Sequence, residues 1–221
     1  MRPTTWPNVL RDGRNVYTRN ADIGHRVYGE DLKLVDGVEY RTWDPWRSKL
    51  AALLVREASF PSLPDPVESV LYLGAAHGTT VSHVADLFPK ATVYAVEKSP
   101  VAFGQLLVLA HRRSNVLPIL ADAQLPERYA ADVGRVDLLY QDIAQRAQTT
   151  ILLENATTFL NPRGCLVFML KVRSVTQTRT PRAITQTAQR ELTEAGYRVL
   201  RTADLSPFAR DHVAFWMTTF P

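Results

Sequence analysis

The chain has 221 residues, of which 46% are hydrophobic and 22% charged, and this size suits one globular domain with or without a small extra lobe. The single cysteine, Cys165, excludes a disulfide framework and a cysteine-rich zinc site, and no run approaches the ~18 apolar residues that a membrane span needs. The formal charge of +4 permits a polyanionic partner, and without a signal-peptide pattern we expect a cytoplasmic protein with no membrane partner.

The first part of the chain predicts a small antiparallel β lobe. Short β-favouring runs at 33–35 and 38–40 flank Asp36-Gly37, a pair typical of the type I′ turn in a two-residue hairpin. We therefore predict this lobe over residues 1–42 and a second domain over 43–221. A helix is expected over 47–56, followed by a turn-rich connection at 61–66.

From residue 69 onward, strands and helices alternate. Strands are predicted at 69–73, 92–96, 116–120, 136–140 and 165–170, and helices at 80–88, 100–112, 146–160 and from Pro181 to just before Gly196. The last two strands, 197–202 and 213–219, are expected as an antiparallel pair at one end of the sheet. This alternation predicts an α/β fold, with a parallel sheet, helices on both faces and ligands beyond the carboxyl ends of the strands.

Side chains at four strand ends suit a nucleoside. The first strand runs into a glycine-rich turn, residues 74–80, that leads into a helix. Glu97 ends the second strand at a spacing from which a carboxylate can hold ribose hydroxyls. Asp122 follows the third strand and can accept a hydrogen bond from an exocyclic amine, and Asp142 follows the fourth. Together they predict a nucleoside site, and the lack of a phosphate-binding lysine motif argues against a nucleoside triphosphate.

Six segments carry a recognisable pattern: 39–52, 71–84, 94–97, 115–123, 136–145 and 210–212. They resemble the fibrillarin family over essentially the whole chain, and the length and missing Gly-Arg tail are similar to its archaeal members. The resemblance implies an S-adenosylmethionine-dependent rRNA and tRNA 2′-O-methyltransferase with a seven-stranded sheet whose last strand is antiparallel. The implied partners are box C/D-type guide RNA, substrate RNA, a Nop-family scaffold protein and, indirectly, a kink-turn-binding ribosomal-type protein.

The resemblance also implies a set of cofactor contacts. They are Gly74, Ala75, Gly78, Thr79, Thr80, Glu97, Lys98, Asp122, Ala123, Asp142, Ile143, Ala144 and Gln145. Two positions depart from the family pattern: His77 stands where serine is usual, and Lys98 stands where an aromatic residue usually follows the acid. The aliphatic stem of Lys98 would then have to pack on adenine in place of that ring.

Methyl transfer from a sulfonium to a ribose hydroxyl needs positioning and a group that orients or accepts the hydroxyl proton. The resemblance implies that Lys49, Asp142, Lys171 and His212 do this, and Asp142 and Lys171 also follow predicted parallel strands at their carboxyl ends. Our hypothesis is that Lys171 orients and deprotonates the 2′-hydroxyl while Asp142 and Lys49 fix it. His212 would help to hold the ribose or complete the polar network.

Weaker signals lie elsewhere in the chain. Residues 171–190 contain five basic residues and no acid, which suggests contacts to RNA phosphates. Trp43 and Trp46 are expected to pack within the lobe rather than to stack on bases. No metal is expected, because His25, His83 and His111 show no metal-ligand spacing.

Two other functions stay open on the sequence alone. One is a nicotinamide-dependent oxidoreductase, which the G-x-x-x-G spacing at Gly74 and Gly78 disfavours. The other is a non-catalytic scaffold subunit of an RNA particle, which the departures at His77 and Lys98 favour. Binding of S-adenosylmethionine would separate methyltransferase activity from both.

Overall fold

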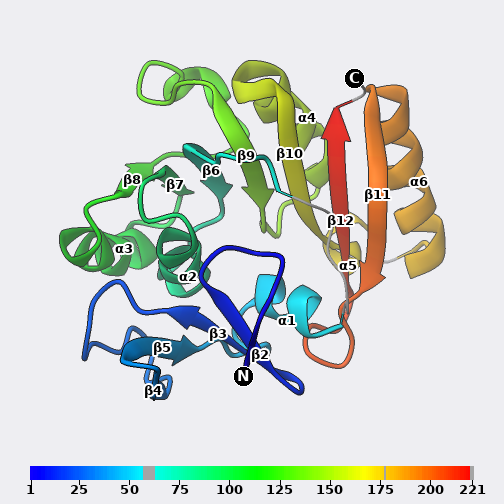
Figure 1. The fold of residues 1–221 in the computed structure, drawn as a ribbon. Coiled ribbons are helices and arrows are strands. Elements are labelled where there is room, and N and C mark those ends of the chain that lie inside the picture. Colours follow the sequence, from blue (N-terminus) through cyan, green and yellow to red (C-terminus); the bar gives the residue numbers. More distant parts are fainter. Residues whose placement is uncertain (57–62, 177, 220–221) are drawn as a thin grey trace.

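The computed structural model describes residues 1–56, 63–176 and 178–219, which form two β-sheets with helices around the larger one (Figure 1). The predicted turn-rich connection at 61–66 begins outside the described residues, which resume at Leu63. The last two residues of the predicted second domain also lie outside them. The division into two domains at residue 42 stays a prediction.

The larger sheet has seven strands in the order β11-β12-β10-β9-β6-β7-β8. Strands β6 to β10 pair in parallel, and β12 runs antiparallel to both β10 and β11, which confirms the predicted α/β sheet. The strands are β6 (Ser69–Leu73), β7 (Thr92–Glu97), β8 (Val116–Leu120), β9 (Val136–Gln141), β10 (Leu160–Lys171), β11 (Tyr197–Asp204) and β12 (His212–Thr219). Strand β10 begins earlier than predicted, because its first residues pair with β9 before an irregularity between Leu160 and Cys165.

Helices cover both faces of this sheet (Figure 1). They are α1 (Lys49–Arg56), α2 (Thr79–Leu87), α3 (Pro100–Arg112), α4 (Gln148–Phe159), α5 (Val172–Val175) and α6 (Pro181–Glu194), with a 3₁₀ turn η1 (Pro126–Arg128). Helices α1, α2 and α3 pack on one face, and α4 and α6 pack on the other. Successive strand residues point to opposite faces, so Tyr72 and Tyr140 belong to the first core and Leu71 and Leu139 to the second.

Helix α6 begins and ends as its sequence predicts. The Thr180 hydroxyl accepts a hydrogen bond from the Ala183 amide, and Pro181 occupies the first turn, where its missing N–H costs nothing. Gly196 follows the helix with a φ of 90°, a left-handed conformation that glycine adopts readily. Helix α5 was not predicted, and it follows β10 directly.

The smaller sheet has the order β1-β2-β3-β5-β4. Its strands are β1 (Arg2–Pro3), β2 (Val9–Asp12), β3 (Asn15–Arg19), β4 (Leu32–Val35) and β5 (Val38–Thr42), and its neighbouring pairs are antiparallel. Asp36 and Gly37 between β4 and β5 have φ values of 49° and 76°. Two positive φ values are the mark of a type I′ turn, so the predicted hairpin is confirmed.

A buried polar network joins the smaller sheet to α2. Arg41 on β5 is fully buried and donates hydrogen bonds to Glu30, Ser82 and Asp86. Arg113, which follows α3, bonds to the same Asp86 carboxylate. Buried charges are costly unless they are paired and hydrogen-bonded, so this network fixes how the two sheets meet.

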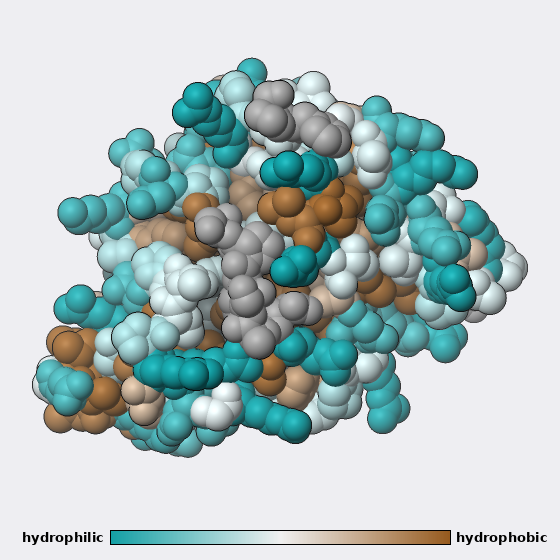
Figure 2. Space-filling view, turned by 45° about the vertical axis from the view of Figure 1, so that its right-hand side comes forward, coloured by the Kyte–Doolittle hydropathy of each residue, from teal (hydrophilic) through white to brown (hydrophobic). Residues whose placement is uncertain are grey.

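Hydrophilic residues cover most of the face in Figure 2, and hydrophobic residues gather there in smaller areas between them. Among the described residues, no helix combines the length and apolar character of a membrane span. Cys165 is buried in the core, and burial raises the pKa of its thiol to about 12. The thiol is therefore a core side chain, as predicted, rather than a nucleophile.

Candidate active site

The glycine-rich turn after β6 is shaped by its contacts with the rest of the fold. Gly74 has a φ of +85°, and a Cβ at this position would lie 2.2 Å from the carbonyl oxygen of Asp142. A Cβ on Gly78 would lie 2.6 Å from a methyl carbon of Leu109. The contact at Gly74 is with backbone, so it excludes any side chain there, whereas at Gly78 the φ of +86° is the stronger reason for glycine, because the Leu109 side chain can move. The glycines thus bring the ends of β6 and β9 together and seat α2 against α3.

Glu97 at the end of β7 holds this turn in place. Its carboxylate accepts hydrogen bonds from the backbone N–H groups of Ala76, at 2.8 Å, and Ser99, at 2.7 Å. Glu97 is only 9% exposed. Each carboxylate oxygen keeps a further lone pair that a ligand hydroxyl can use.

A cavity of about 240 Å³ opens beside these residues, beyond the carboxyl ends of β6, β7, β8 and β9. Nine of the predicted cofactor residues line it: Gly74, Glu97, Lys98, Asp122, Ala123, Asp142, Ile143, Ala144 and Gln145. Three further lining residues were not predicted, namely Ala76, Val96 and Ala121. Each of the three is next in sequence to a predicted residue, and this position could have identified them.

Four predicted cofactor residues do not line this cavity: Ala75, Gly78, Thr79 and Thr80. Ala75 is buried in the core, and the Thr80 hydroxyl donates a 3.0 Å hydrogen bond to Ser48 just before α1. These residues shape the turn and tie α2 to α1. Their contact with a cofactor stays a prediction.

Asp122 forms a hydrogen-bond acceptor site at one end of the cavity. Burial would raise the pKa of Asp122, but hydrogen bonds from Gln145 and Gln124 and the charge of Lys98 together lower it, so the side chain is a carboxylate at neutral pH. Its Oδ1 lies 2.8 Å from Nε2 of Gln145. The other amide atom, Oε1 of Gln145, is buried and has no donor among the described residues.

Lys98 forms an ion pair that was not predicted. Its ammonium nitrogen lies 3.7 Å from Asp122, and its side chain is 55% exposed. Lys98 therefore lines the cavity, and its positive charge lies near Asp122. Its position after Glu97 in the sequence did not indicate this ion pair.

These donors and acceptors fit a nucleoside. Glu97 can accept from ribose hydroxyls, whereas Asp122 and the unpaired Gln145 oxygen can both accept from an exocyclic amine. The side chains of Val96 and Ile143 give the same cavity apolar walls. A buried acceptor without a donor is costly, so a ligand amine at this end would remove that cost.

The four predicted catalytic residues converge at the same edge of the sheet. The ammonium of Lys49, the first residue of α1, lies 2.8 Å from Oδ2 of Asp142. Lys171 at the end of β10 pairs directly with His212 at the start of β12. Asp142 also lines the cavity, so it is common to both groups of residues.

The pKa of the His212 ring is affected by the charges of the other three side chains. Burial lowers the pKa of its ring, the charges of Lys49 and Lys171 lower it further, and the Arg210 carbonyl and Asp142 act in the opposite direction. The net result is a pKa below 6.5 and a neutral ring at neutral pH. Nδ1 lies 2.8 Å from the carbonyl oxygen of Arg210, which can only accept, so Nδ1 carries the proton. Nε2 is then the acceptor of this ring.

Gln148, in the first turn of α4, was not predicted. Its side-chain amide brackets the backbone of Lys171: Oε1 accepts from the Lys171 N–H at 2.9 Å, and Nε2 donates to the Lys171 carbonyl at 3.0 Å. Gln141 in turn donates to the Gln148 carbonyl. The contact joins positions 23 residues apart, and a single glutamine in a helix gives no sequence signal for it.

The basic stretch after β10 is partly neutralised. Arg173 pairs with Asp211 at 2.9 Å, Arg190 approaches Glu194 at 3.9 Å, and Arg179 donates to the Thr187 hydroxyl. Among the described residues, no group of three or more His, Cys, Asp and Glu side chains is arranged to hold a metal ion.

The fold and the cavity define a class, the Rossmann-like S-adenosylmethionine-dependent methyltransferases. At the level of fold alone, the chain is similar to a SAM-dependent methyltransferase from Aquifex aeolicus, with a TM-score of 0.56, 14% identity and coverage of 80% of this chain and 90% of that one. The fibrillarin family profile matches residues 6–220, and the chain belongs to the fibrillarin family, as its motifs predicted.

Relatives and solved structures agree over nearly the whole chain. The fibrillarin-like rRNA/tRNA 2′-O-methyltransferase of Methanosarcina acetivorans is 44% identical over 208 residues, 93% of this chain and 91% of the relative. Aeropyrum pernix fibrillarin, solved with natively bound S-adenosyl-L-methionine, superposes with a TM-score of 0.86 at 38% identity, covering 98% of this chain and 96% of that one. The fibrillarin of a fibrillarin/Nop5p complex superposes with a TM-score of 0.87 at 41% identity, covering 96% of this chain and 98% of that one.

Proposed function

We propose that this chain transfers the methyl group of S-adenosylmethionine to ribose 2′-hydroxyls of rRNA and tRNA, at positions chosen by box C/D-type guide RNA in a ribonucleoprotein particle. One observation carries the proposal: Asp142 lines the cavity at the strand ends and also holds the Lys49 ammonium at 2.8 Å. A methyl group bound in that cavity and a hydroxyl beside Lys49 would therefore be neighbours. Relatives named as 2′-O-methyltransferases support the same reading.

The cavity residues would hold the cofactor by their hydrogen-bonding capacity. Glu97 suits the ribose hydroxyls, and Asp122 with Gln145 suits the adenine amine. The bound cofactor supplies an already activated methyl group, so the protein has mainly to position the acceptor and manage its proton. The binding of S-adenosylmethionine by a relative that is 38% identical supports this assignment.

The four polar residues at the sheet edge would handle the 2′-hydroxyl. Lys171 is proposed to orient and deprotonate it, with Lys49 held in place by Asp142. His212 is proposed to hold the ribose, because its ring is neutral at neutral pH and Nε2 is free to accept a hydrogen bond.

A particle with several components is proposed around this enzyme. A Nop-family scaffold protein is the expected direct partner, supported by the fibrillarin/Nop5p complex whose fibrillarin is 41% identical to this chain. Guide RNA, substrate RNA and a kink-turn-binding protein complete the proposal. Exposed basic residues beside the site, such as Arg182, would contact phosphates. RNA affinity should then fall steeply as salt is raised.

The test is methyl transfer in an assembled particle with Lys171→Ala and Asp142→Ala. Either variant should lose most of the transfer, and wild-type turnover in one of them would remove that residue from the mechanism. Calorimetry with S-adenosylmethionine separates the alternatives, because an oxidoreductase or a pure scaffold would not bind it. Mapping ribose methylation in cells with and without the protein would identify the modified nucleotides.

A further inference from the structure

Trp46 is the one tryptophan of four that reaches solvent. It is 65% exposed, whereas Trp6, Trp43 and Trp216 are each 4% exposed or less. Packing within the lobe was expected for both Trp43 and Trp46, and it is correct for Trp43 only. The ring of Phe208 meets Trp46 nearly edge-on, with centroids 5.1 Å apart and planes at 73°. The indole is therefore supported on one side and open to a ligand elsewhere.

The turn that carries Trp46 is held rigidly. Asp44 accepts a 2.8 Å hydrogen bond from the Trp46 N–H through its carboxylate. Its carbonyl accepts from the N–H groups of Arg47 and Ser48. An aromatic ring on a fixed turn loses little entropy when it binds, so this exposed ring is preorganised as a contact surface.

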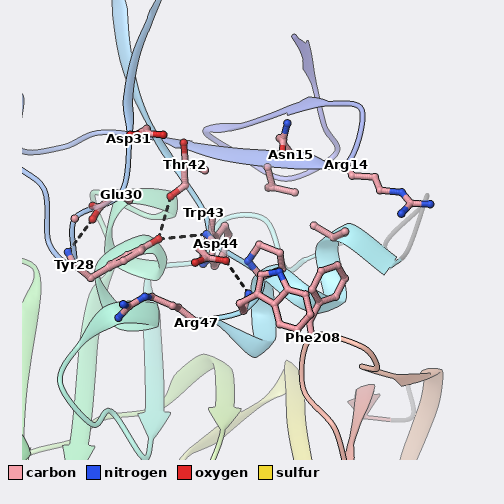
Figure 3. A pocket seen from close by; sticks show the side chains of 15 residues that line it. Arg14, Asn15, Tyr28, Glu30, Asp31, Thr42, Trp43, Asp44, Arg47 and Phe208 are labelled. Atoms are coloured by element: carbon pink, nitrogen blue, oxygen red, sulfur yellow. Dashed lines mark hydrogen bonds between the residues drawn. The ribbon is translucent and has the colours of Figure 1, made fainter.

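The aromatic pair lies in a second cavity, of about 570 Å³, on the side of α1 that faces the smaller sheet. Figure 3 shows Arg47 beside Tyr28 at one side of this cavity, Arg14 at the other, and Phe208 between them. The Arg47 guanidinium lies 5.8 Å from the centre of the Tyr28 ring. Within the described residues, neither arginine forms an ion pair, so both charges are available to an anionic ligand.

The carboxylates of this cavity do not cancel that charge. Glu30 is bound by Arg41 and by two backbone N–H groups, and Asp44 is occupied within its own turn. Asp31 alone remains exposed. The cavity therefore presents aromatic rings together with cationic side chains, the combination that binds single-stranded nucleic acid.

The position of the pair ties it to the reaction. Trp46 precedes Lys49 by three residues, which limits their Cα separation to roughly 11 Å. Phe208 precedes His212 by four residues, a limit of roughly 14 Å. The two segments that supply Lys49 and His212 thus supply the two rings as well. An RNA strand with one ribose at Lys49 can therefore reach these rings with another of its nucleotides.

We propose that Trp46, backed by Phe208 and flanked by Arg47, is a stacking platform for an unpaired base of the RNA strand that carries the target ribose. The inference rests on the proposed function, since it assumes that RNA is the methyl acceptor. RNA is favoured over a protein ligand because the platform lies within a few residues of Lys49 and His212 and has unpaired arginines beside it. Stacking is tolerant of sequence, which suits an enzyme whose target is chosen by a guide.

The test uses the intrinsic fluorescence of Trp46, which alone among the tryptophans is open to solvent. The full chain is titrated at low salt with a single-stranded oligoribonucleotide and with an abasic strand of the same length, and binding is followed independently by anisotropy of a label. The base-bearing strand should quench the fluorescence and protect it from acrylamide, whereas the abasic strand should do neither. Trp46→Ala should weaken binding of the base-bearing strand roughly 5- to 150-fold.

Two variants sharpen this result. Trp46→Phe keeps an aromatic face and should retain most of the RNA affinity while losing the quenching signal. Leu34→Ala removes a side chain that is 75% exposed on the smaller sheet and should change nothing. Equal affinity of wild type and Trp46→Ala for RNA would overturn the proposal, as would a failure of RNA to alter the fluorescence.

Loss of a Nop-family partner by Trp46→Ala, with RNA affinity intact, would also overturn it and assign the surface to protein. An absence of methyl transfer by the wild type would instead count against the proposed function. The fluorescence readout does not depend on that transfer, so the two failures can be told apart.

Discussion

The ammonium nitrogen of Lys49 lies 2.8 Å from Oδ2 of Asp142, although the two residues are 93 positions apart in the chain. Both side chains are partly buried, at 27% and 19% exposure. The contact connects the first residue of α1 to the end of β9, and so it links the segment before the large sheet to the cavity that Asp142 lines. It is the contact on which the proposed mechanism depends most directly.

Lys49→Met should abolish this ion pair while leaving the cavity lining intact. We expect methyl transfer in the assembled particle to fall about 10²- to 10⁴-fold, because a positioned polar group is lost from the acceptor side. Single-turnover methylation measures this, and calorimetry should show a Kd for S-adenosylmethionine near that of the wild type. Glu194→Gln is the matched control, because it removes the partner of Arg190 in an exposed ion pair. A normal turnover in Lys49→Met would show that the ion pair is only structural.

Gly74→Ala should destroy cofactor binding. The added Cβ would meet the Asp142 carbonyl at 2.2 Å, and a φ of +85° is itself unfavourable for alanine. The end of β9 must then shift and take Asp142 with it. Gly104→Ala provides the control, since that glycine lies within α3 with open space around it, and alanine there should stabilise the helix by up to about 1 kcal/mol. Calorimetry and thermal unfolding of both variants decide the matter; intact binding in Gly74→Ala would contradict the close approach.

Gln148→Leu should lower kcat without changing cofactor affinity. The leucine leaves the N–H and carbonyl of Lys171 without partners, so this lysine loses its fixed backbone position. Gln148→Glu keeps the acceptor for the Lys171 N–H and should recover part of the rate. Steady-state methylation should rank the wild type first, Gln148→Glu second and Gln148→Leu last. The Kd for S-adenosylmethionine should be the same in all three. Equal rates in the two variants would show that Gln148 does not position Lys171.

Asp86→Asn should reduce the free energy of unfolding by about 3–5 kcal/mol. Two buried guanidinium groups, of Arg41 and Arg113, bond to this carboxylate, and the substitution leaves Glu30 as the one carboxylate of the network for two buried positive charges. Urea unfolding measures the loss. An exposed pair offers the comparison: Glu194→Gln removes the partner of Arg190 and should change stability by less than about 1 kcal/mol. A mild effect at Asp86 would mean that the network relaxes or admits water.

Stability should fall as the pH drops below about 6.5, before the carboxylates titrate. His83 is fully buried between the Thr18 and Tyr28 hydroxyls, and burial, with the charges of Arg41 and Arg113, holds the pKa of its ring well below 6.5. The unfolded chain therefore binds a proton in this range that the folded chain does not. Each such histidine reduces stability by up to about 1.4 kcal/mol per pH unit, with full stability above this window.

Urea titrations between about pH 7.5 and 5 measure that slope. His212 contributes in the same direction, because its pKa is also lowered. His83→Gln should be less stable at neutral pH, since it disturbs two buried hydrogen bonds, yet it should show a shallower slope. An unchanged slope in this variant would exclude His83 as the group responsible.

Local patterns predicted the fold well because each depends on a few neighbouring residues. Asp36-Gly37 demands a turn with two positive φ values, and Thr180-Pro181 caps a helix whatever surrounds it. Alternating strands and helices then determine the large sheet, and the carboxyl ends of its strands bring Glu97, Asp122 and Asp142 to one cavity. The exposure of Trp46 was not predictable, because tryptophan side chains are usually buried and only the complete fold shows which of them has no room in the core.

The amino-acid order alone determined the α/β class of the large sheet, most of the residues that line the cavity and membership of the family, since periodicity and motif spacing are properties of short segments. The tertiary structure decided which groups meet: Gln148 with Lys171, Arg41 with Asp86, and Phe208 with Trp46. Such contacts join distant parts of the chain, and their geometry depends on how whole helices and sheets pack. No local pattern records that packing.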